Sequence, residues 1–441
     1  MPSLFHYWAM HMFSVRRLLF PLITLVSTPL MATTFDELAK LPPSDIQVID
    51  CRSSNNYNGW PEASQTRGGH FPGAINFDSD WLSTLRPPHL EQLLQSKGIE
   101  LTKPTFLYCE PEKANVLLKQ LDSIGINNVS TISQKISDYS GQLDHLAKFE
   151  KLVTPQWLKQ VIDGEQALYA PEKGFKVVEV AWGPPTKYLA AHIPGSLYLN
   201  TNNIESEPWW NRVDDQKLAE TIKQLGIRFD TTVVLYGRDN TAAARAASIL
   251  MYAGVDDVRL LNGGWKSWVN AGYRTEPMLN KAPKHVDFGR PIPSRPELII
   301  DVPEARAILD DPEHKSLVSI RSWEEYIGNT SGYKYIKPKG RITGSKWGHA
   351  GSDAYHLEDF RNPDDTMISA DIIEAFWKDW GINELQKVSF YCGTGWRASE
   401  TFFYAYVMGW EDISVFDGGW FEWSGDPANP SSKGDVAPDH S

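Results

Sequence analysis

KVSFYCGTGWRASETF, at residues 387–402, predicts a short buried strand, a tight loop and a helix. β-Forming residues lead up to Cys392, Gly393 and Gly395 permit the positive φ angles of a tight loop, and aromatic residues recur at helical spacing after Arg397. Cys392 is thus placed at the carboxyl end of a strand, facing loop N–H groups and the positive end of the helix dipole. These surroundings favour the thiolate, which is the nucleophilic form of cysteine.

The same loop is predicted to hold an anionic substrate beside the sulfur of Cys392. Its backbone N–H groups can donate hydrogen bonds, and Arg397 adds a fixed cation. The alternative is a buried structural cysteine in a glycine-rich turn, because cysteine often packs as a small core residue. The glycines, the arginine and the strand-end position favour the functional interpretation. The predicted substrate-binding residues are Gly393, Thr394, Gly395, Trp396 and Arg397.

Length, charge and cysteine content limit the class of protein. A chain of 441 residues suggests about three domains. A net charge of −12 without a Lys/Arg-rich run argues against a nucleic-acid partner. Besides Cys392, the cysteines are Cys51 and Cys109, which both follow apolar runs and can pair. No Cys/His group has the spacing of a metal site, so we expect no metal.

The N-terminus has the layout of a secretory signal peptide. Arg16 and Arg17 precede the apolar run 18–26, and small residues follow up to Ala32. The run is too short for a transmembrane helix, and no later stretch approaches one. We therefore expect export and a mature chain without a membrane span. An uncleaved, membrane-anchored form stays open as an alternative, because the cleavage site is imperfect.

One order of parts recurs three times along the chain. Each copy has a buried strand, a polar turn, a second buried strand and a helix. Two copies then end in matching segments, 254–265 and 409–420, that finish in Gly-Gly-Trp. Strands that alternate with helices indicate parallel sheets covered on both faces. The second strands of the copies are 105–109, 232–237 and 387–392, and the turns are 70–74, 192–196 and 341–345.

These repeats predict an α/β protein of three tandem domains, each with a central parallel sheet flanked by helices. The boundaries expected from the sequence are a signal peptide at 1–32, domains at 33–150, 151–276 and 297–426, a linker at 277–296, and a flexible tail at 427–441.

The motifs together resemble the rhodanese family of sulfurtransferases, and most closely its exported three-domain members. The resemblance rests on the strand 49–52, the His-x-Pro-Gly turns, the loop from Cys392 to Arg397 and the end at 417–420. It implies a periplasmic enzyme in which Cys392 takes up sulfane sulfur as a persulfide and passes it to a thiophilic acceptor such as cyanide. Two successive displacements imply ping-pong kinetics without a metal or organic cofactor. The expected donors are thiosulfate, 3-mercaptopyruvate or a protein persulfide, and the sequence does not choose among them.

Departures from the family pattern affect all three copies. The second domain has Gly237 at the nucleophile position and is expected to be inactive. In the first domain Cys109 aligns with Cys392, but two carboxylates follow it at 110–114, which would disfavour a thiolate and repel an anion. The first domain is therefore also expected to be inactive. In the third domain the usual aspartate, histidine and proline are replaced by Ser319, Arg341 and Thr343.

The third domain also has an insertion between Ile320 and Met367, rich in Tyr, Trp, Lys and Gly. It is either a substrate or partner mouth above Cys392 or a packed surface loop. Trp396 and Trp420 are candidates for pocket walls, with packing the favoured role of Trp420.

Two functions from other classes compete with sulfur transfer. A cysteine phosphatase or arsenate reductase would need a Cys-x5-Arg cradle, whereas the count from Cys392 to Arg397 is one residue shorter. A binding role is the other rival, in which the first two domains shield the third or recruit a sulfur donor and catalysis is weak.

Overall fold

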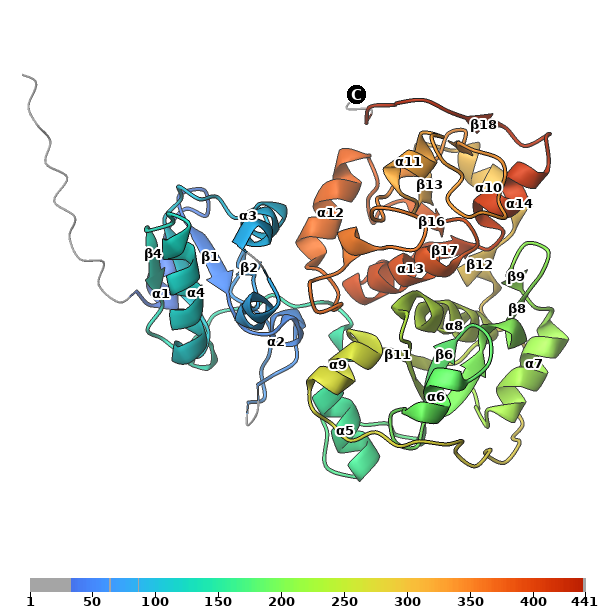
Figure 1. The fold of residues 1–441 in the computed structure, drawn as a ribbon, viewed down its shortest axis with the longest axis horizontal. Coiled ribbons are helices and arrows are strands. Elements are labelled where there is room, and N and C mark those ends of the chain that lie inside the picture. Colours follow the sequence, from blue (N-terminus) through green and yellow to red (C-terminus); the bar gives the residue numbers. More distant parts are fainter. Residues whose placement is uncertain (1–32, 63–64, 86, 439–441) are drawn as a thin grey trace, which may run out of the picture.

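The computed structural model describes residues 33–62, 65–85 and 87–438, which form three α/β domains in chain order (Figure 1). Every strand pair in the three larger sheets is parallel, so the predicted α/β class with central parallel sheets is confirmed. The predicted signal peptide, 1–32, lies outside the described residues. Within them, no helix is long and apolar enough to cross a membrane.

The first domain is built on a four-stranded sheet of order β2-β1-β3-β4. Its central strands β1 and β3 are buried along their whole length, as expected for strands covered on both faces. The strands are β1 (Gln47–Asp50), β2 (Ile75–Asn76), β3 (Thr105–Tyr108) and β4 (Val129–Thr131), and the α-helices are α1 (Phe35–Leu38), α2 (Ser54–Asn58), α3 (Pro87–Ser96) and α4 (Pro111–Ser123).

The second domain has a five-stranded sheet of order β5-β11-β10-β6-β7 and a small hairpin, β8–β9. Asp239 caps the start of its long helix α8, and Gly254 ends that helix in the left-handed conformation. The strands are β5 (Leu152–Val153), β6 (Phe175–Ala181), β7 (Leu197–Asn200), β8 (Glu205–Ser206), β9 (Asn211–Arg212), β10 (Thr232–Tyr236) and β11 (Asp257–Leu261), and the helices are α5 (Pro155–Asp163), α6 (Thr186–Ala190), α7 (Asp215–Gln224), α8 (Asn240–Ala253) and α9 (Gly264–Asn270).

The third domain repeats this plan with the order β12-β17-β16-β13-β15. Helix α13 follows β16 directly, as the sequence predicts for residues 387–402. The strands are β12 (Ile299–Ile300), β13 (Lys315–Ser319), β14 (Arg341–Ile342), β15 (Lys346–Trp347), β16 (Lys387–Tyr391), β17 (Ile413–Phe416) and β18 (Ser431–Ser432), and the helices are α10 (Val302–Leu309), α11 (Trp323–Tyr326), α12 (Ala370–Asp379), α13 (Trp396–Met408) and α14 (Gly419–Gly425).

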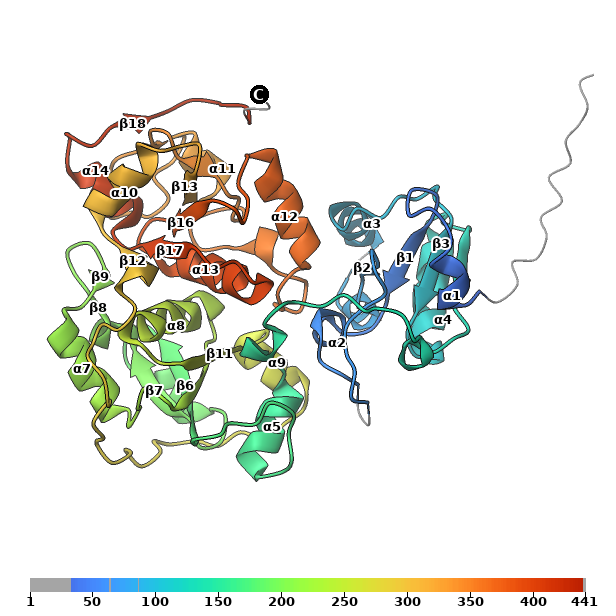
Figure 2. The same ribbon diagram turned by 180° about the vertical axis from the view of Figure 1, so that it is seen from behind.

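The second and third domains share one hydrophobic core. Helices α8 and α13 lie side by side between the two sheets, and their buried faces belong to a single apolar cluster that includes Cys392 (Figure 2). At the centre of this contact the hydroxyls of Ser248 and Ser399 lie 3.0 Å apart. The helix that carries the cysteine loop therefore packs directly on its counterpart from the second domain.

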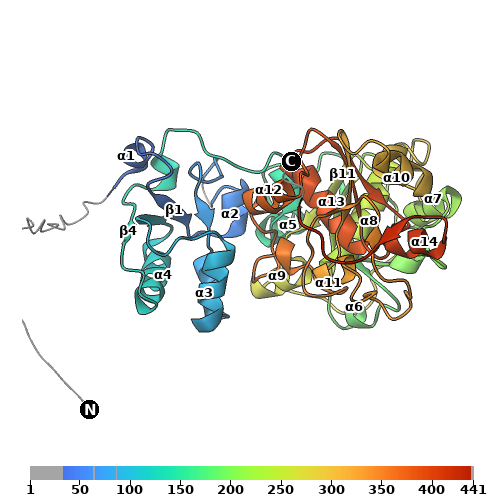
Figure 3. The same ribbon diagram turned by 90° about the horizontal axis from the view of Figure 1, so that it is seen from above.

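The first domain docks on the side of this pair (Figure 3). Trp60 donates its indole N–H to the Leu152 carbonyl at 2.9 Å, and Asn262 donates to Asn55 at 2.8 Å. Lys97 reaches the third domain and donates to Asn362. Trp60 also packs in a hydrophobic cluster with residues of the second domain, so the contact combines polar and apolar groups.

The prediction of a flexible tail from residue 427 is wrong for the segment up to Gly434. Strand β18 pairs antiparallel with β14, and Trp423 donates its indole N–H to the Pro430 carbonyl at 3.0 Å. Arg341 also donates to the Gly434 carbonyl at 2.8 Å. The polar composition of the segment concealed this order, because β14 and Arg341, with which it pairs, lie about ninety residues earlier in the chain. Residues 439–441 lie outside the described residues.

Candidate active site

Cys392 is fully buried at the carboxyl end of β16, and within the described part of the chain it is the free cysteine. Its sulfur accepts the backbone N–H of Gly395 at 3.2 Å. Helix α13 begins at the next residue, so the sulfur also lies at that helix's N-terminal end, where the first N–H groups have no partner within the helix. Thr394, between the two, is buried in the loop.

The two loop glycines are needed for different reasons. Gly395 has φ +100°, the left-handed conformation that the sequence predicts. Gly393 does not have a positive φ, and that part of the prediction is wrong. Glycine is needed at position 393 because there is no room for a side chain: a Cβ atom there would collide with the ring of Tyr333.

The segment after β17 forms backbone hydrogen bonds with the cysteine loop. Trp420 donates its backbone N–H to the Cys392 carbonyl at 2.8 Å, and Phe421 donates to the Gly393 carbonyl at 3.1 Å. Gly419 permits this approach, since a Cβ atom there would lie 2.7 Å from the Cys392 carbonyl oxygen. The Trp420 side chain is fully buried and donates to Pro338, which agrees with the predicted packing role.

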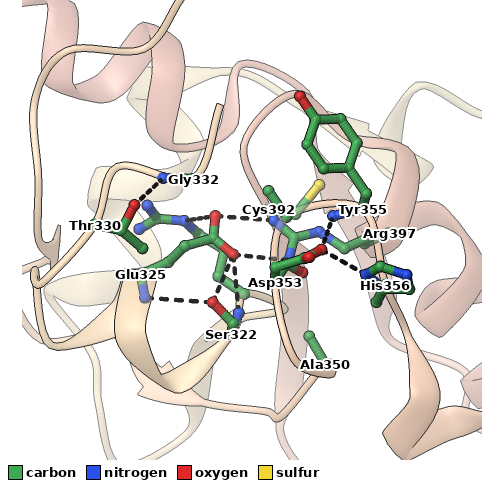
Figure 4. Close-up of polar contacts among 12 residues, drawn as sticks. Ser322, Glu325, Thr330, Gly332, Ala350, Asp353, Tyr355, His356, Cys392 and Arg397 are labelled. Carbon is green, nitrogen blue, oxygen red and sulfur yellow. Dashed lines mark hydrogen bonds and ion pairs between the residues drawn. The ribbon is translucent and has the colours of Figure 1, made fainter. Parts of the chain in front are cut away.

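Arg397 is not free to meet an anion with its terminal nitrogens. Both form a bidentate pair with Glu325, at 2.9 and 3.0 Å, and one also donates to the Asp353 carbonyl at 3.1 Å (Figure 4). Only Nε of this buried guanidinium has no hydrogen-bond partner among the described residues. The role of Arg397 as an anion ligand stays a prediction, and Nε is the atom that could serve it.

Glu325 joins two arginines beneath the loop. Besides Arg397 it accepts from Arg321 Nε at 3.3 Å and from the backbone N–H of Ser322 at 3.0 Å. Burial acts to raise the pKa of Glu325, but the two guanidinium groups outweigh it and bring the pKa down to about 2. Glu325 was not predicted from the sequence, although Ser322-x-x-Glu325 is a capping-box pattern that marks it.

The insertion of the third domain borders the cysteine loop. Tyr333 is buried against Gly393, stacks on Tyr335 with ring centroids 5.3 Å apart, and meets Tyr355 edge-on at 5.2 Å. Tyr355 is exposed and Tyr335 is about half exposed, and the partial burial of Tyr335 raises its pKa to about 12. The insertion is therefore packed at its base and presents aromatic rings at its rim. The packing interpretation is confirmed for Tyr333, and a substrate or partner mouth stays a prediction. Tyr355 was not singled out from the sequence.

The second domain completes the wall of the site. Trp396 donates its indole N–H to the buried carboxylate of Glu205, at 2.9 and 3.0 Å to the two oxygens. Trp209 packs edge-on against Phe421, with ring centroids 5.0 Å apart. No sequence signal marked Glu205 or Trp209, because their partners lie in another domain.

The equivalent loops of the other two domains differ from this site. Cys109 forms a disulfide with Cys51, which confirms that this pair can form and leaves no free thiol in that loop. Gly237 stands at the end of β10, where Cys392 stands at the end of β16. Among the described residues, a free cysteine thus occurs only in the third loop.

The repeated fold and the strand-end cysteine loop define a tandem rhodanese. The family model for the rhodanese-like domain matches residues 34–142, 154–271 and 301–426, and the chain belongs to the rhodanese family. It is an enzyme of the sulfurtransferase class.

Among curated proteins, the chain is 48% identical over 408 residues to thiosulfate sulfurtransferase YnjE of Escherichia coli K12, covering 92% of this chain and 93% of the relative. It is also 31% identical over 261 residues to the sulfur carrier protein TtuD of Thermus thermophilus, covering 56% of this chain and 87% of the relative.

Two solved structures superpose on nearly the whole chain. The crystal structure of YnjE gives a TM-score of 0.88 at 48% identity, over 92% of this chain and 97% of that one. The wild-type structure of EanB gives 0.88 at 39% identity, over 92% of this chain and 98% of that one. EanB variants are known in complex with hercynine and with ergothioneine, and two of the ergothioneine complexes contain the persulfide of its cysteine.

Proposed function

We propose that this enzyme moves sulfane sulfur from thiosulfate or 3-mercaptopyruvate to cyanide or another thiophilic acceptor, through a persulfide on Cys392. The observation that carries the proposal is the free Cys392 sulfur at a strand end, with the Gly395 N–H directed at it. The name of the relative YnjE supports thiosulfate as the donor.

Two displacements make up the proposed reaction. The Cys392 thiolate attacks the outer sulfur of thiosulfate, a sulfur–sulfur bond forms to the cysteine, and sulfite leaves with the electron pair of the broken bond. An acceptor nucleophile then attacks the outer sulfur of the persulfide, and the thiolate returns. The N–H groups of residues 393–397 are proposed to bind the anionic groups during both steps, since N–H groups at a helix start favour negative charge.

Export to the periplasm is part of the same proposal. The basic and apolar pattern of the N-terminus supports it. The disulfide between Cys51 and Cys109 supports it independently, because disulfides persist mainly in oxidising compartments.

Intact mass measurement tests the sulfur-accepting role. The mature protein and Cys392→Ser are incubated separately with thiosulfate and with 3-mercaptopyruvate. One added sulfur on the wild type alone, removed again by cyanide, is the expected result and identifies the donor. Sulfur added equally to Cys392→Ser would refute the role of this cysteine, and no addition with either donor would point to a protein persulfide donor or a binding role.

A cationic betaine is a second candidate acceptor. The observation that favours it is the aromatic group of Tyr333, Tyr335, Tyr355 and Phe421 beside the loop, because aromatic faces attract quaternary ammonium groups. The solved complexes of EanB with hercynine, a trimethylammonium betaine, agree with this choice. Incubation of the persulfide form with hercynine, followed by mass detection of ergothioneine, distinguishes this acceptor from cyanide.

A further inference from the structure

Helices α8 and α13 hold equivalent places in the second and third domains and pack against each other. Each follows a central strand, one ending at Tyr236 and the other at Tyr391. The ninth residue after each strand end is Arg245 in α8 and Glu400 in α13. Because the helices pack side by side, each of these side chains faces the domain to which it does not belong.

Arg245 is completely buried and binds across the domain boundary. It donates to Asp417 of the third domain at 2.6 Å and to Glu205 of its own domain at 3.2 Å. It also donates to the Trp210 carbonyl at 3.1 Å. Asp417 directly follows β17, in the segment that forms backbone hydrogen bonds with the cysteine loop.

The Arg245 guanidinium also touches the cysteine loop itself. A Cβ atom on Gly395 would lie 2.9 Å from Nη1 of Arg245, so this loop residue packs directly on the guanidinium. Nη1 is buried and has no hydrogen-bond partner among the described residues. Gly395 is the residue whose N–H bonds to the Cys392 sulfur, and it therefore contacts both the sulfur and this cation.

The opposite contact, from the third domain to the second, has the opposite charge. Glu400 lines a narrow cavity with Asn240 and Gly263, beside the loop that has no cysteine. It is paired with Arg361 through two hydrogen bonds of 2.9 and 2.6 Å. The loop with a nucleophile thus meets a guanidinium from its neighbour, and the loop without one meets a carboxylate.

We propose that Arg245 is a positioning residue of the Cys392 site, supplied by the domain that has Gly237 in place of a cysteine. It packs against Gly395, whose N–H bonds to the sulfur, and fixes Trp396 through Glu205. The inference rests on the proposed sulfur transfer and deepens it. It gives the second domain a part in catalysis that needs no cysteine of its own.

The charge of Arg245 matters as much as its shape. Without it, Glu205 and Asp417 would be two buried carboxylates beside a loop that must hold a thiolate and an anionic donor. Burial already raises the pKa of Glu205, and Arg245 and Trp396 act against that rise. Loss of the guanidinium therefore disfavours the reactive form of the site as well as its geometry.

The test compares Arg245→Met and Arg245→Lys with a matched control, Arg361→Met. The control also removes a guanidinium from a paired arginine near the joint of the two domains, but on the side of the loop without a cysteine. Single-turnover sulfur loading from thiosulfate is followed by mass in the full chain. Its amplitude reports the folded fraction, and its rate constant reports the site.

We expect Arg245→Met to lower the loading rate constant about 10- to 100-fold, because small displacements of a reacting group have effects of that size. Arg245→Lys should restore part of the rate. Lysine returns the positive charge, but it lacks the planar guanidinium that binds Glu205 and Asp417 together. Arg361→Met should stay within about twofold of the wild type, because it does not contact the reactive loop. Equal falls in the rate constants of Arg245→Met and Arg361→Met, or a fall in amplitude alone, would show that Arg245 is merely structural.

A second measurement does not depend on the sulfur donor. Cys392 is alkylated with iodoacetate, an anion, and with iodoacetamide, which is neutral, and the ratio of the two rates reports the local charge. Arg245→Met should lower this ratio several-fold, and Arg361→Met should leave it unchanged. An unchanged ratio in Arg245→Met would overturn the charge argument, even if the wild type accepted no sulfur from thiosulfate and the proposed function failed.

Discussion

At the residue scale, one difference between the first and third domains changes the arrangement of charges under the reactive loop. In the first domain Asp50, at the end of β1, accepts from Arg52 two residues later, at 3.0 and 2.6 Å. In the third domain the equivalent position is Ser319, so Arg321 has no acid there and bonds to Glu325 instead. Because serine and not an acid ends this strand, Arg321 is available for the network that holds Arg397.

Glu325→Gln tests the network at low pH. The pKa of Glu325 is about 2 in the folded chain against an ordinary value of 4.5, so its ionised form stabilises the fold above pH 4.5, and this contribution is lost as pH falls towards 2. The shift corresponds to about 3 kcal/mol of unfolding free energy. Urea unfolding should find the variant less stable by roughly this amount at pH 6, with the difference shrinking by pH 3. A difference independent of pH would contradict the assignment of the charge to Glu325.

Gly395→Ala tests whether the loop needs space as well as a positive φ. The new Cβ would meet Arg245 at 2.9 Å, in addition to the strain at φ +100°. Gly125→Ala is the matched control, because its φ is +86° and no atom lies within 4 Å of its Cβ position. Both should lose about 1–2 kcal/mol of stability from backbone strain, but only Gly395→Ala should slow sulfur loading. Equal loading rates in the two variants would show that the contact does not matter.

At the element scale, the sequence was sufficient for the parts whose causes are local. The run of β-formers, the loop glycines and the helical spacing up to Phe402 predicted β16, the loop and α13, because each depends on neighbours in the chain. The contact of α8 with α13 could not be predicted in this way. Arg245 is one arginine in an alanine-rich helix, and its acceptor Asp417 lies 172 residues away. The order of the segment around β18 was missed for the same reason.

The disulfide of the first domain joins the ends of two adjacent parallel strands, β1 and β3. It closes a loop between residues 58 positions apart, which corresponds to about 4 kcal/mol by the chain-entropy relation. Cys51→Ala/Cys109→Ala should therefore lower the unfolding midpoint of this domain, while sulfur loading of Cys392 stays within about twofold, because distant sites act independently. Reduction should have the same effect on the wild type and none on the double variant. A loss of loading without a loss of stability would assign the first domain a part in sulfur transfer.

At the scale of the whole molecule, the first domain is held by a buried lysine whose charge depends on pH. Lys97 follows α3, is 3% exposed, donates to Asn362 of the third domain and lies 5.0 Å from the Trp81 ring centroid. Burial lowers its pKa to about 7, although Asp371 and Asp364 act to raise it. The charged form of Lys97 is therefore unfavourable in the assembled molecule near neutral pH.

This shift predicts that the assembled chain becomes more stable as pH rises above 7. Between about pH 7 and the ordinary lysine value of 10.5, the unfolded chain holds a proton on Lys97 that the folded chain has released, and stability rises with pH wherever the unfolded state binds more protons. Below pH 7 both states are protonated, and the full penalty of burial remains. Asp78 gives the opposite slope at lower pH, because burial raises its pKa from 3.8 to about 7 and stability therefore falls as pH rises between these values.

Lys97→Met separates these two contributions. It should raise the unfolding midpoint near pH 7 and remove the rise between pH 7 and 9.5, because no proton is then released on folding. The decline that Asp78 causes as pH rises towards 7 should remain. The control is Lys281→Met, an exposed lysine of the linker, which should keep the wild-type profile. Thermal unfolding at half-unit steps of pH measures both the decline below pH 7 and the rise above it. An alkaline rise that persists in Lys97→Met would place the titrating group elsewhere. If the rise disappears, pH acts through Lys97 on the joint between the first and third domains.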